Sequence, residues 1–239
     1  MSNVNVFLTA EWKNLIMANY AIDPAILQAW LPKHTALDYF ESKCYVSLVG
    51  FLFDKVKIKG ISIPFHTRFP EVNLRFYVKR KEGNEWRRGV VFISEIVPKP
   101  AIAWVANTLY NEKYKALKMK DAFLTVTDSI SVEYDWKWKG VWNAISVKAL
   151  NEPRAMTAGS KEAFIFEHFY GYSMHAAGTN EYRVEHPSWN VYPVLKYGIF
   201  CNFEEQYGKE FAVLNKQEPA SVFLANGSAV SIGGKTRLD

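Results

Sequence analysis

Polar and apolar residues alternate strictly in one short stretch of the chain, from Glu71 to Lys79. Its apolar residues are Val72, Leu74, Phe76 and Val78, and the residues between them are Glu71, Asn73, Arg75, Tyr77 and Lys79. Successive side chains of a β-strand point to opposite faces, so this pattern predicts a strand with one apolar and one polar face. The polar face either meets water or lines a cavity in which a carboxylate, an amide and a guanidinium converge on a ligand.

Several further segments have the composition of strands. The β-branched and aromatic run Cys44–Phe53 is typical of a buried strand. The turn sequence Glu82–Trp86 separates the alternating strand, Pro70–Lys79, from an apolar run at Gly89–Val97, which predicts a hairpin. A second hairpin and three more strands complete the set: Ser129–Trp138, Val141–Lys148, Glu181–Glu185, Lys196–Phe203 and Ser221–Ala225.

Three segments carry helix signals. Asp23 is placed as an N-cap and is followed by Pro24 at the first helical position. Ala101–Tyr110 has apolar residues at helical spacing, and Ser160 caps a segment that is helical or, from Phe166 on, a strand. Because strands outnumber helices, the sequence predicts a mainly β fold (β-rich α+β), in which an antiparallel sheet closes into a barrel or a sandwich.

The composition fits a single domain over residues 1–239. Of the 239 residues, 49% are hydrophobic and 15% are aromatic, which is enough for a core together with an apolar pocket. The last predicted strand ends before residue 227, so we expect residues 227–239 to form a loose tail.

Charge and cysteine usage narrow the functional classes. The net charge of +5 comes from scattered Lys and Arg, which argues against nucleic acid as a partner and fits attraction of a small anion. Cys44 and Cys201 form no disulfide or zinc motif and no histidine pair has metal-ligand spacing, so no metal or cofactor is expected. Without a secretory signal or a membrane-spanning apolar run, we expect a cytoplasmic protein with no membrane partner.

Four blocks of the sequence resemble the family catalogued as domain of unknown function 2071 (DUF2071), whose members are also called YqjF-like proteins. The blocks are L-P-K-H-T-A-L-D-Y-F (Leu31–Phe40), F-P-E-V-N-L-R-F-Y-V (Phe69–Val78), G-V-V-F-I-S-E-I (Gly89–Ile96) and N-E-Y-R-V-E-H-P-S-W (Asn180–Trp189). The similarity spans residues 12–222. The family is similar in turn to the acetoacetate decarboxylase-like superfamily, which implies an antiparallel closed β-barrel with a central cavity, a few peripheral helices and a homo-oligomer.

The resemblance gives the polar strand face an expected direction. Strand faces of such a barrel alternate between the lumen and the outer layer, so Glu71, Asn73 and Arg75 are expected to face inward. Glu71 also matches a glutamate of the decarboxylases, which makes it a candidate acid or base.

The resemblance breaks down at the catalytic lysine. Decarboxylases of this type form a Schiff base between a lysine and the substrate ketone, which requires a neutral amine. On the alignment that we prefer, Tyr114 falls where that lysine would be and Lys115 where its partner would be. Imine chemistry therefore requires Lys113 or Lys115 to reach the site, and the alternative is that these lysines belong to a solvated basic segment.

The remaining charged candidates each have more than one interpretation. Arg75 could clamp a carboxylate with two hydrogen bonds, form an ion pair with Glu71 or Glu95, or face solvent on the strand. Glu95 interrupts an apolar strand and needs a partner such as Arg75 if it is buried, so it either forms a structural pair or lines the pocket. Arg183 could pair with Glu167 on the lumen side or form a surface ion pair.

Together these features predict a protein that binds a small, partly apolar, carboxylate-bearing molecule in a barrel lumen. The expected ligand-binding residues are Glu71, Asn73, Arg75, Glu95, Tyr114 and Arg183, and the candidate catalytic residues are Lys115 and Glu71. One alternative is a decarboxylase-like lyase, or a hydrolase, that acts on a keto acid. Another is a non-catalytic scaffold whose lumen is filled by side chains.

Overall fold

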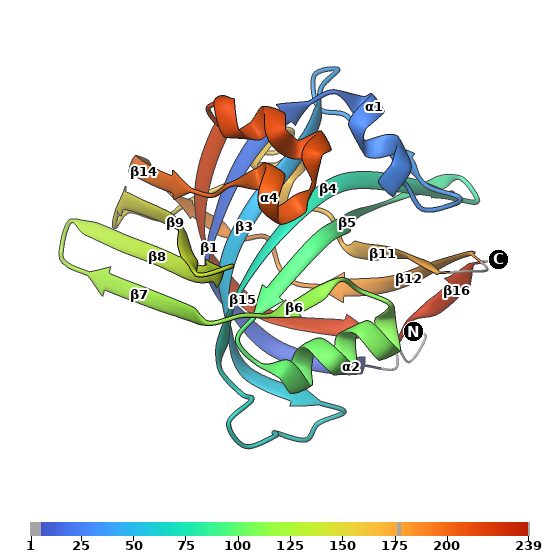
Figure 1. Cartoon of the computed structure of the whole chain (residues 1–239), viewed down its shortest axis with the longest axis horizontal. Coiled ribbons are helices and arrows are strands. Elements are labelled where there is room, and N and C mark those ends of the chain that lie inside the picture. Colours follow the sequence, from blue (N-terminus) through green and yellow to red (C-terminus); the bar gives the residue numbers. More distant parts are fainter. Residues whose placement is uncertain (1–5, 176–177, 239) are drawn as a thin grey trace.

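The computed structural model describes residues 6–175 and 178–238, and most of them belong to β-strands (Figure 1). The main sheet follows the order β10-β13-β15-β1-β3-β4-β5-β11-β12-β16, with β2 on β4 and β6 on β5. Its strands are β1 (Val6–Ile22), β2 (Ala36–Leu37), β3 (Cys44–Ile58), β4 (Phe69–Glu82), β5 (Glu85–Val97), β6 (Tyr114–Ala116), β10 (Arg154–Ala155), β11 (Tyr170–His175), β12 (Gly178–Glu185), β13 (Asn190–Tyr192), β15 (Ser221–Gly233) and β16 (Thr236–Leu238). The prediction of a mainly β fold is confirmed.

Seven strands of this sheet form a ring. β12 pairs with β11 on one side and with β15 on the other, through Val184 opposite Ile232. From β15 the order of pairing runs through β1, β3, β4 and β5, and β5 pairs in turn with β11. Most of these pairs are antiparallel, as predicted, but β5 pairs in parallel with both β6 and β11.

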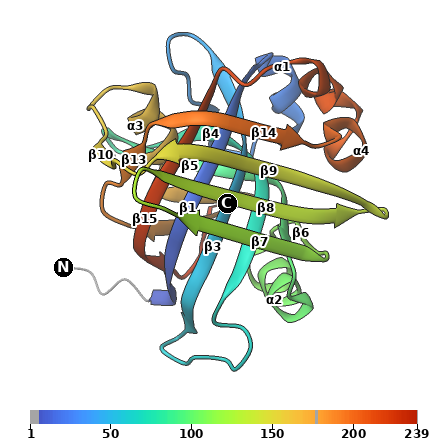
Figure 2. The same cartoon turned by 90° about the vertical axis from the view of Figure 1, so that its left-hand side faces the viewer.

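A second sheet covers one side of the ring. It consists of β14 (Val194–Phe200), β9 (Val141–Leu150), β8 (Ser129–Trp138) and β7 (Met119–Thr125), in that order. Its strands cross over β1, β3 and β15 (Figure 2). Phe76 from β4 and Trp136 from β8 are fully buried in the core between the two layers. Each such side chain stabilises the fold by about 2–3 kcal/mol relative to an exposed one.

The helices are short and lie around the strands. They are α1 (Pro24–Leu27), α2 (Pro100–Tyr110), α3 (Lys161–Phe166) and α4 (Phe203–Tyr207), with 3₁₀ turns at Gln28–Trp30 and Lys209–Lys216. Asp23 caps α1 by accepting a hydrogen bond from the Ala25 amide, and Ser160 caps α3 through the Ala163 amide. Both caps were predicted. The strand considered from Phe166 on begins four residues later, as β11 at Tyr170, and Phe166 itself ends α3.

Two segments differ from the expectations. β1 was not predicted, although it is the longest strand of the main sheet. The expected loose tail at residues 227–239 is wrong, because β15 continues to Gly233 and β16 follows it. This end of the chain is ordered by a distant partner: β15 pairs with β1 from Ser221 opposite Asn19 to Gly233 opposite Val6.

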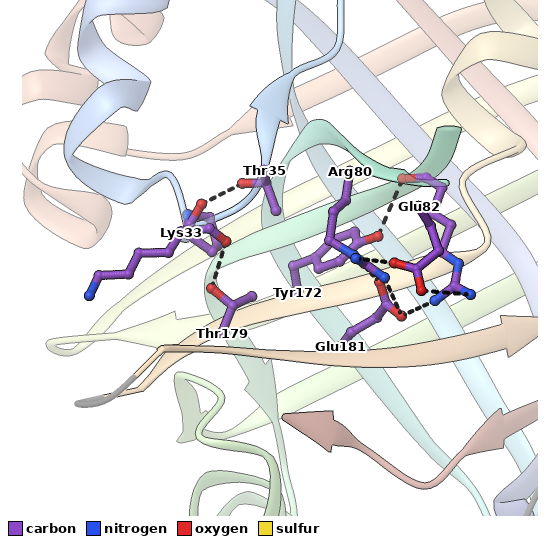
Figure 3. A network of polar contacts seen from close by, with 9 residues as sticks. Lys33, Thr35, Arg80, Glu82, Tyr172, Thr179 and Glu181 are labelled. Carbon is purple, nitrogen blue, oxygen red and sulfur yellow. Dashed lines mark hydrogen bonds and ion pairs between the residues drawn. The ribbon is translucent and has the colours of Figure 1, made fainter. Parts of the chain in front are cut away.

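A buried ion-pair network joins β4 and β5 to β12 (Figure 3). Arg80 Nε lies 2.7 Å from Glu181 Oε2, and Arg87 Nη1 lies 2.6 Å from Glu181 Oε1. Arg80 belongs to the face of β4 that also carries Phe76. The carboxylate of Glu181 is thus held by two guanidinium groups.

Within the described residues, no helix is long and apolar enough to cross a membrane.

Candidate functional site

The polar face of β4 points into the interior of the ring. Glu71 and Asn73 are 2% and 1% exposed, and Asn73 Nδ2 donates a hydrogen bond to Glu71 Oε1 over 2.9 Å. Arg75, on the same face, is half-buried. All three side chains line one cavity of about 70 Å³, which we call the Arg75 cavity. The alternation of the strand is therefore the reason that a carboxyl, an amide and a guanidinium share one space.

A cluster of carboxyls and tyrosines forms part of the wall of this cavity and extends beyond it. We call it the carboxyl–tyrosine cluster, and its members are Glu71, Glu95, Glu112, Tyr114 and Tyr182. The Tyr114 hydroxyl donates to Glu71 Oε2 over 2.8 Å, and the Tyr182 hydroxyl donates to Glu112 Oε1 over 2.9 Å. The parallel pairing of β6 with β5 sets Tyr114 beside Glu95. Four separate segments of the chain thus contribute to one polar cluster.

Burial raises the pKa values of all three carboxyls, because the charged form loses its hydration. The pKa of Glu71 rises to about 7, and that of Glu112 rises to about 8, although hydrogen bonds to both carboxyls oppose the change. The pKa of Glu95 lies well above its usual range, through burial and then through the charges of Glu112 and Glu71. Near neutral pH the cluster therefore holds protons that it can donate, and it can accept them back after ionisation.

A glycine makes room for one member of the cluster. Gly171 of β11 lies opposite Tyr182 of β12, and a Cβ atom at position 171 would lie 2.1 Å from Tyr182 Cζ. The absence of a side chain lets the tyrosine ring cross β11 and reach Glu112 with its hydroxyl. Burial raises the pKa of Tyr182, so the hydroxyl keeps its proton and remains a donor.

A second cavity, of about 100 Å³, adjoins the same cluster. We call it the α2 cavity, because Ile102, Val105 and Ala106 of α2 form one of its walls. The residues that line both cavities are Phe53, Glu71, Glu95, Tyr114, Tyr182 and Ile232. Most of the carboxyl–tyrosine cluster is therefore a wall that the two cavities share.

Several buried polar atoms around the Arg75 cavity have no hydrogen-bond partner among the described residues. They are Trp12 Nε1, Asn73 Oδ1, Arg75 Nε, Glu95 Oε2 and His168 Nδ1. Buried polar groups in proteins are nearly always hydrogen-bonded, because leaving one unpaired costs about 1–3 kcal/mol. A group of them around one cavity indicates that water or a polar ligand completes their bonds.

Arg75 is the cation of this cavity. Its Nη2 makes a weak 3.5 Å contact with Met17 Sδ, and its guanidinium carbon lies 5.8 Å from the centre of the Tyr77 ring. Within the described part of the chain it forms no ion pair, so the alternative in which it pairs with Glu71 or Glu95 is wrong. A positive charge is thus available at the cavity wall.

The lysines expected near the site lie elsewhere. Lys115 Nζ is 3.5 Å from the Gln206 carbonyl oxygen and 4.6 Å from the centre of the Trp138 ring. Lys113 Nζ lies 3.9 Å from the centre of the Trp30 ring. Burial lowers the pKa of both lysines, but neither lines either cavity. The expectation that Lys115 reaches the site is corrected, because β6 turns Tyr114 and Lys115 to opposite faces.

The expectation that Arg183 binds the ligand is also corrected. Its side chain is 52% exposed and forms an ion pair with Glu185, with 3.1 Å between Arg183 Nε and Glu185 Oε1. It lines neither cavity, because Tyr182 is the residue of this pair on β12 that points inward. Arg183 therefore belongs to a surface ion pair, and its expected partner Glu167 instead accepts a hydrogen bond from Ser188.

Sequence reasoning missed Glu112, Tyr182 and His168. Tyr182 could have been found, since it is the inward position between Glu181 and Arg183 in an alternating strand. Glu112 and His168 lie outside strands and carried no such signal. Burial lowers the pKa of His168 to about 4, so its imidazole is neutral near pH 7, and its Nε2 lies 3.2 Å from a carboxylate oxygen of Asp38.

Across residues 6–175 and 178–238, no group of three or more His, Cys, Asp or Glu side chains is arranged to hold a metal ion.

The fold has known counterparts among solved structures. An acetoacetate decarboxylase-like enzyme from Sphingomonas wittichii RW1 superposes with a TM-score of 0.67 at 16% identity, over 99% of this chain and 94% of that one. Acetoacetate decarboxylase from Legionella pneumophila subsp. pneumophila str. Philadelphia 1 gives 0.65 at 12% identity, over 98% and 88%. The enduracididine biosynthesis enzyme MppR, solved in complex with pyruvate, gives 0.68 at 10% identity, over 100% and 92%. The TM-scores show a shared fold, that of the acetoacetate decarboxylase-like enzymes, and at identities this low the likeness is one of fold alone.

The chain belongs to the family of uncharacterized conserved proteins called domain of unknown function 2071, which it matches over residues 9–229. The resemblance predicted from the four sequence blocks is thereby confirmed. The chain is also similar to the uncharacterized protein YqjF of Bacillus subtilis (strain 168), with 27% identity over 110 residues. That alignment spans 46% of this chain and 44% of YqjF.

Proposed function

We propose that the protein binds a small carboxylate-bearing molecule in the Arg75 cavity. The observation that carries the proposal is the positive charge of Arg75 at the cavity wall, whose Nε has no hydrogen-bond partner among the described residues. A carboxylate would supply the missing negative charge and accept hydrogen bonds from the guanidinium. The unpaired indole nitrogen of Trp12 offers a further donor.

The carboxyl–tyrosine cluster suits this ligand. Three ionised carboxylates beside the cavity would repel an anion, but burial keeps their pKa values high enough for them to hold protons near neutral pH. The cluster can then share protons with a bound molecule. Glu71 is the candidate acid or base, because it lines both cavities and accepts hydrogen bonds from Asn73 and Tyr114.

If the protein is an enzyme, this geometry favours proton transfer by Glu71 over a lysine Schiff base. No lysine of the described residues lines either cavity, and the tyrosine at position 114 cannot form an imine. A decarboxylase-like lyase or a hydrolase that uses carboxyl groups is therefore the second candidate function. Its support is the elevated pKa of Glu71, near 7, beside an unpaired guanidinium.

Part of the proposal concerns the architecture of the protein. We regard the ring of seven strands as a closed barrel within a single domain, with the Arg75 cavity in its lumen. A scaffold with a filled lumen predicts no cavity, so the two cavities argue against that alternative. A homo-oligomer and a cytoplasmic location stay predictions.

Ligand binding can be measured through the tryptophans of the cavity. Trp12 and Trp189 both line it, so their fluorescence should change when short carboxylates such as butanoate, pyruvate or acetoacetate are added. We expect saturable binding by the wild type and roughly 100-fold weaker binding by Arg75→Met, since hydrogen bonds to a charged group contribute about 1.5–3 kcal/mol. The matched control is Arg183→Met, which removes an exposed guanidinium and should bind as the wild type does.

Two outcomes would refute the proposal. One is that Arg75→Met binds carboxylates as tightly as Arg183→Met does. The other is that the wild type binds the methyl ester of an acid as well as the acid itself, because an ester carries no charge for Arg75. Borohydride reduction of the same mixtures separates the mechanisms, since a stoichiometric adduct on a lysine would revive the Schiff-base reading.

A further inference from the structure

The two cavities differ in the walls that they do not share. The Arg75 cavity adds polar side chains with unpaired atoms, among them Asn73, Arg75 and His168. The α2 cavity adds mainly apolar side chains, and its two polar additions already have partners. The Tyr110 hydroxyl donates to the Gly233 carbonyl oxygen, and Glu112 accepts from Tyr182.

The α2 cavity is suited to an apolar occupant. Apart from the shared Glu95, none of its lining side chains has an unpaired buried polar atom among the residues described. Its volume is about 100 Å³. An apolar cavity on the order of 150 Å³ binds benzene, so this one has room for a short alkyl chain.

We propose that the molecule bound by the protein is a carboxylic acid with an unbranched alkyl chain, held across both cavities. This inference rests on the carboxylate site proposed above and assigns each end of the ligand to a place. The carboxylate lies on Arg75, and the chain passes the carboxyl–tyrosine cluster and ends against Ile102, Val105 and Ala106 of α2.

This orientation fixes which part of the ligand meets the cluster. Glu71, Glu95, Tyr114 and Tyr182 form the wall that both cavities share, so they face the carbons next to the carboxylate rather than the end of the chain. The protons of the cluster are then within reach of the functionalised end of the molecule. Chemistry, if any, falls on those carbons, while the chain contributes affinity and length selection.

A chain-length series tests the assignment. Straight-chain acids from acetate to decanoate would be titrated by calorimetry at pH 6.5. Each added methylene should tighten binding about fourfold until the α2 cavity is filled, and the series should then level off. Arg75→Met should weaken every acid by a similar factor.

A matched pair of variants on α2 locates the chain. Ala106→Trp places an indole at the wall of the α2 cavity and should abolish the gain with chain length. Ala101→Trp adds the same side chain at an exposed position of the same helix and should keep the gain. The wild-type series needs no folded variant, so it stands alone if Ala106→Trp does not fold.

The outcomes separate this inference from the function on which it rests. A flat series with Arg75-dependent binding would overturn the two-cavity ligand and leave the carboxylate site standing. A chain-length gain that persists in folded Ala106→Trp would overturn the placement of the chain. If no acid binds to the wild type, the carboxylate site itself is wrong, and the inference falls with it.

Discussion

Two buried carboxyl sites in this protein have pKa values shifted in opposite directions. In the ion-pair network of β4, β5 and β12, Glu181 is held by Arg80 and Arg87. Burial acts to raise its pKa, but the hydrogen bond and charge of Arg80 outweigh burial and lower it. In the interior, the pKa values of Glu71 and Glu112 are raised to about 7 and about 8.

The main difference between the two sites is the supply of cations. Glu71 and Glu181 are 2% and 5% exposed, so both have lost most of their hydration. The carboxylate of Glu181 has two guanidinium partners and is complete as it stands. In the interior, Glu71 has the charge of Arg75 nearby and Glu112 that of Lys113, but no ion pair joins either carboxyl to a cation among the described residues. A saturated network of this kind stabilises the fold, whereas an unsaturated one is suited to a ligand.

The largest expected effect is on the ion-pair network of Glu181. Glu181→Gln leaves Arg80 and Arg87 without their carboxylate and should lower the free energy of unfolding by roughly 3 kcal/mol at pH 7.5. The pKa of Glu181 is lowered in the folded protein, so its contribution is present above the unfolded pKa of 4.5 and is lost on acidification. Urea denaturation at pH 7.5 and pH 4 measures both. A loss of stability that is the same at the two pH values would contradict this account.

The same substitution in the interior should have the opposite sign. Glu112→Gln removes a carboxyl whose folded-state pKa is raised to about 8. A raised pKa means that the wild type loses stability as pH climbs from about 4.5 to about 8, because the unfolded chain ionises freely in this range while the folded state keeps the carboxyl protonated.

Glu112→Gln has no carboxyl to ionise at this position, so its unfolding free energy does not fall with pH for this reason. The variant should therefore gain on the wild type by roughly 2 kcal/mol between pH 5 and pH 6.5 in denaturant titrations. A difference that does not change with pH would show that Glu112 is ionised throughout, and the contrast between the two carboxyl groups would disappear.

Gly171→Ala tests the close contact that lets Tyr182 reach Glu112 in the interior cluster. The new methyl group would meet the Tyr182 ring and push its hydroxyl away from Glu112. We expect a loss of about 1–2 kcal/mol in unfolding free energy, as is usual for overpacking. A thermal melt against a matched Gly198→Ala variant measures it, because Gly198 is an exposed strand glycine whose added methyl group would meet only the Ser146 hydroxyl. Equal melting temperatures would mean that Tyr182 moves freely.

The smallest effect is expected at Lys115. Its amine contacts the Trp138 ring and a carbonyl oxygen away from both cavities. Lys115→Met should change carboxylate affinity less than about twofold and unfolding free energy by under about 1 kcal/mol. Loss of ligand binding in this variant would place the lysine in the site after all.

The part of the site on β4 could be predicted because it depends on local order alone. Period-2 alternation puts Glu71, Asn73 and Arg75 on one face whatever the rest of the chain does. The resemblance to a barrel family then indicated that this face turns inward. The two hairpins and the caps at Asp23 and Ser160 were predictable for the same reason, since each depends on a few neighbouring residues.

The rest of the site depends on long-range pairing. Glu112 and Tyr182 meet only because the ring of strands brings β12 beside the segment that leads into β6. Lys115 was a candidate because the alignment with the decarboxylases placed it beside their catalytic lysine, and the direction of its side chain depends on the pairing of β6 with β5. β1 was missed because Leu15–Tyr20 is buried throughout, so its sequence shows no alternation. Because β1 was not predicted, its pairing partner β15 was expected to end at Ala225 rather than at Gly233.

The central claim is that Arg75 holds a carboxylate whose chain extends into the α2 cavity. A crystal structure with 6-bromohexanoate tests it most directly, because the anomalous signal of bromine marks one end of the ligand. We expect the bromine in the α2 cavity, beside Ala106, and the carboxylate within hydrogen-bonding distance of Arg75 Nε. A bromine peak in the Arg75 cavity, or a carboxylate bound away from Arg75, would contradict the account.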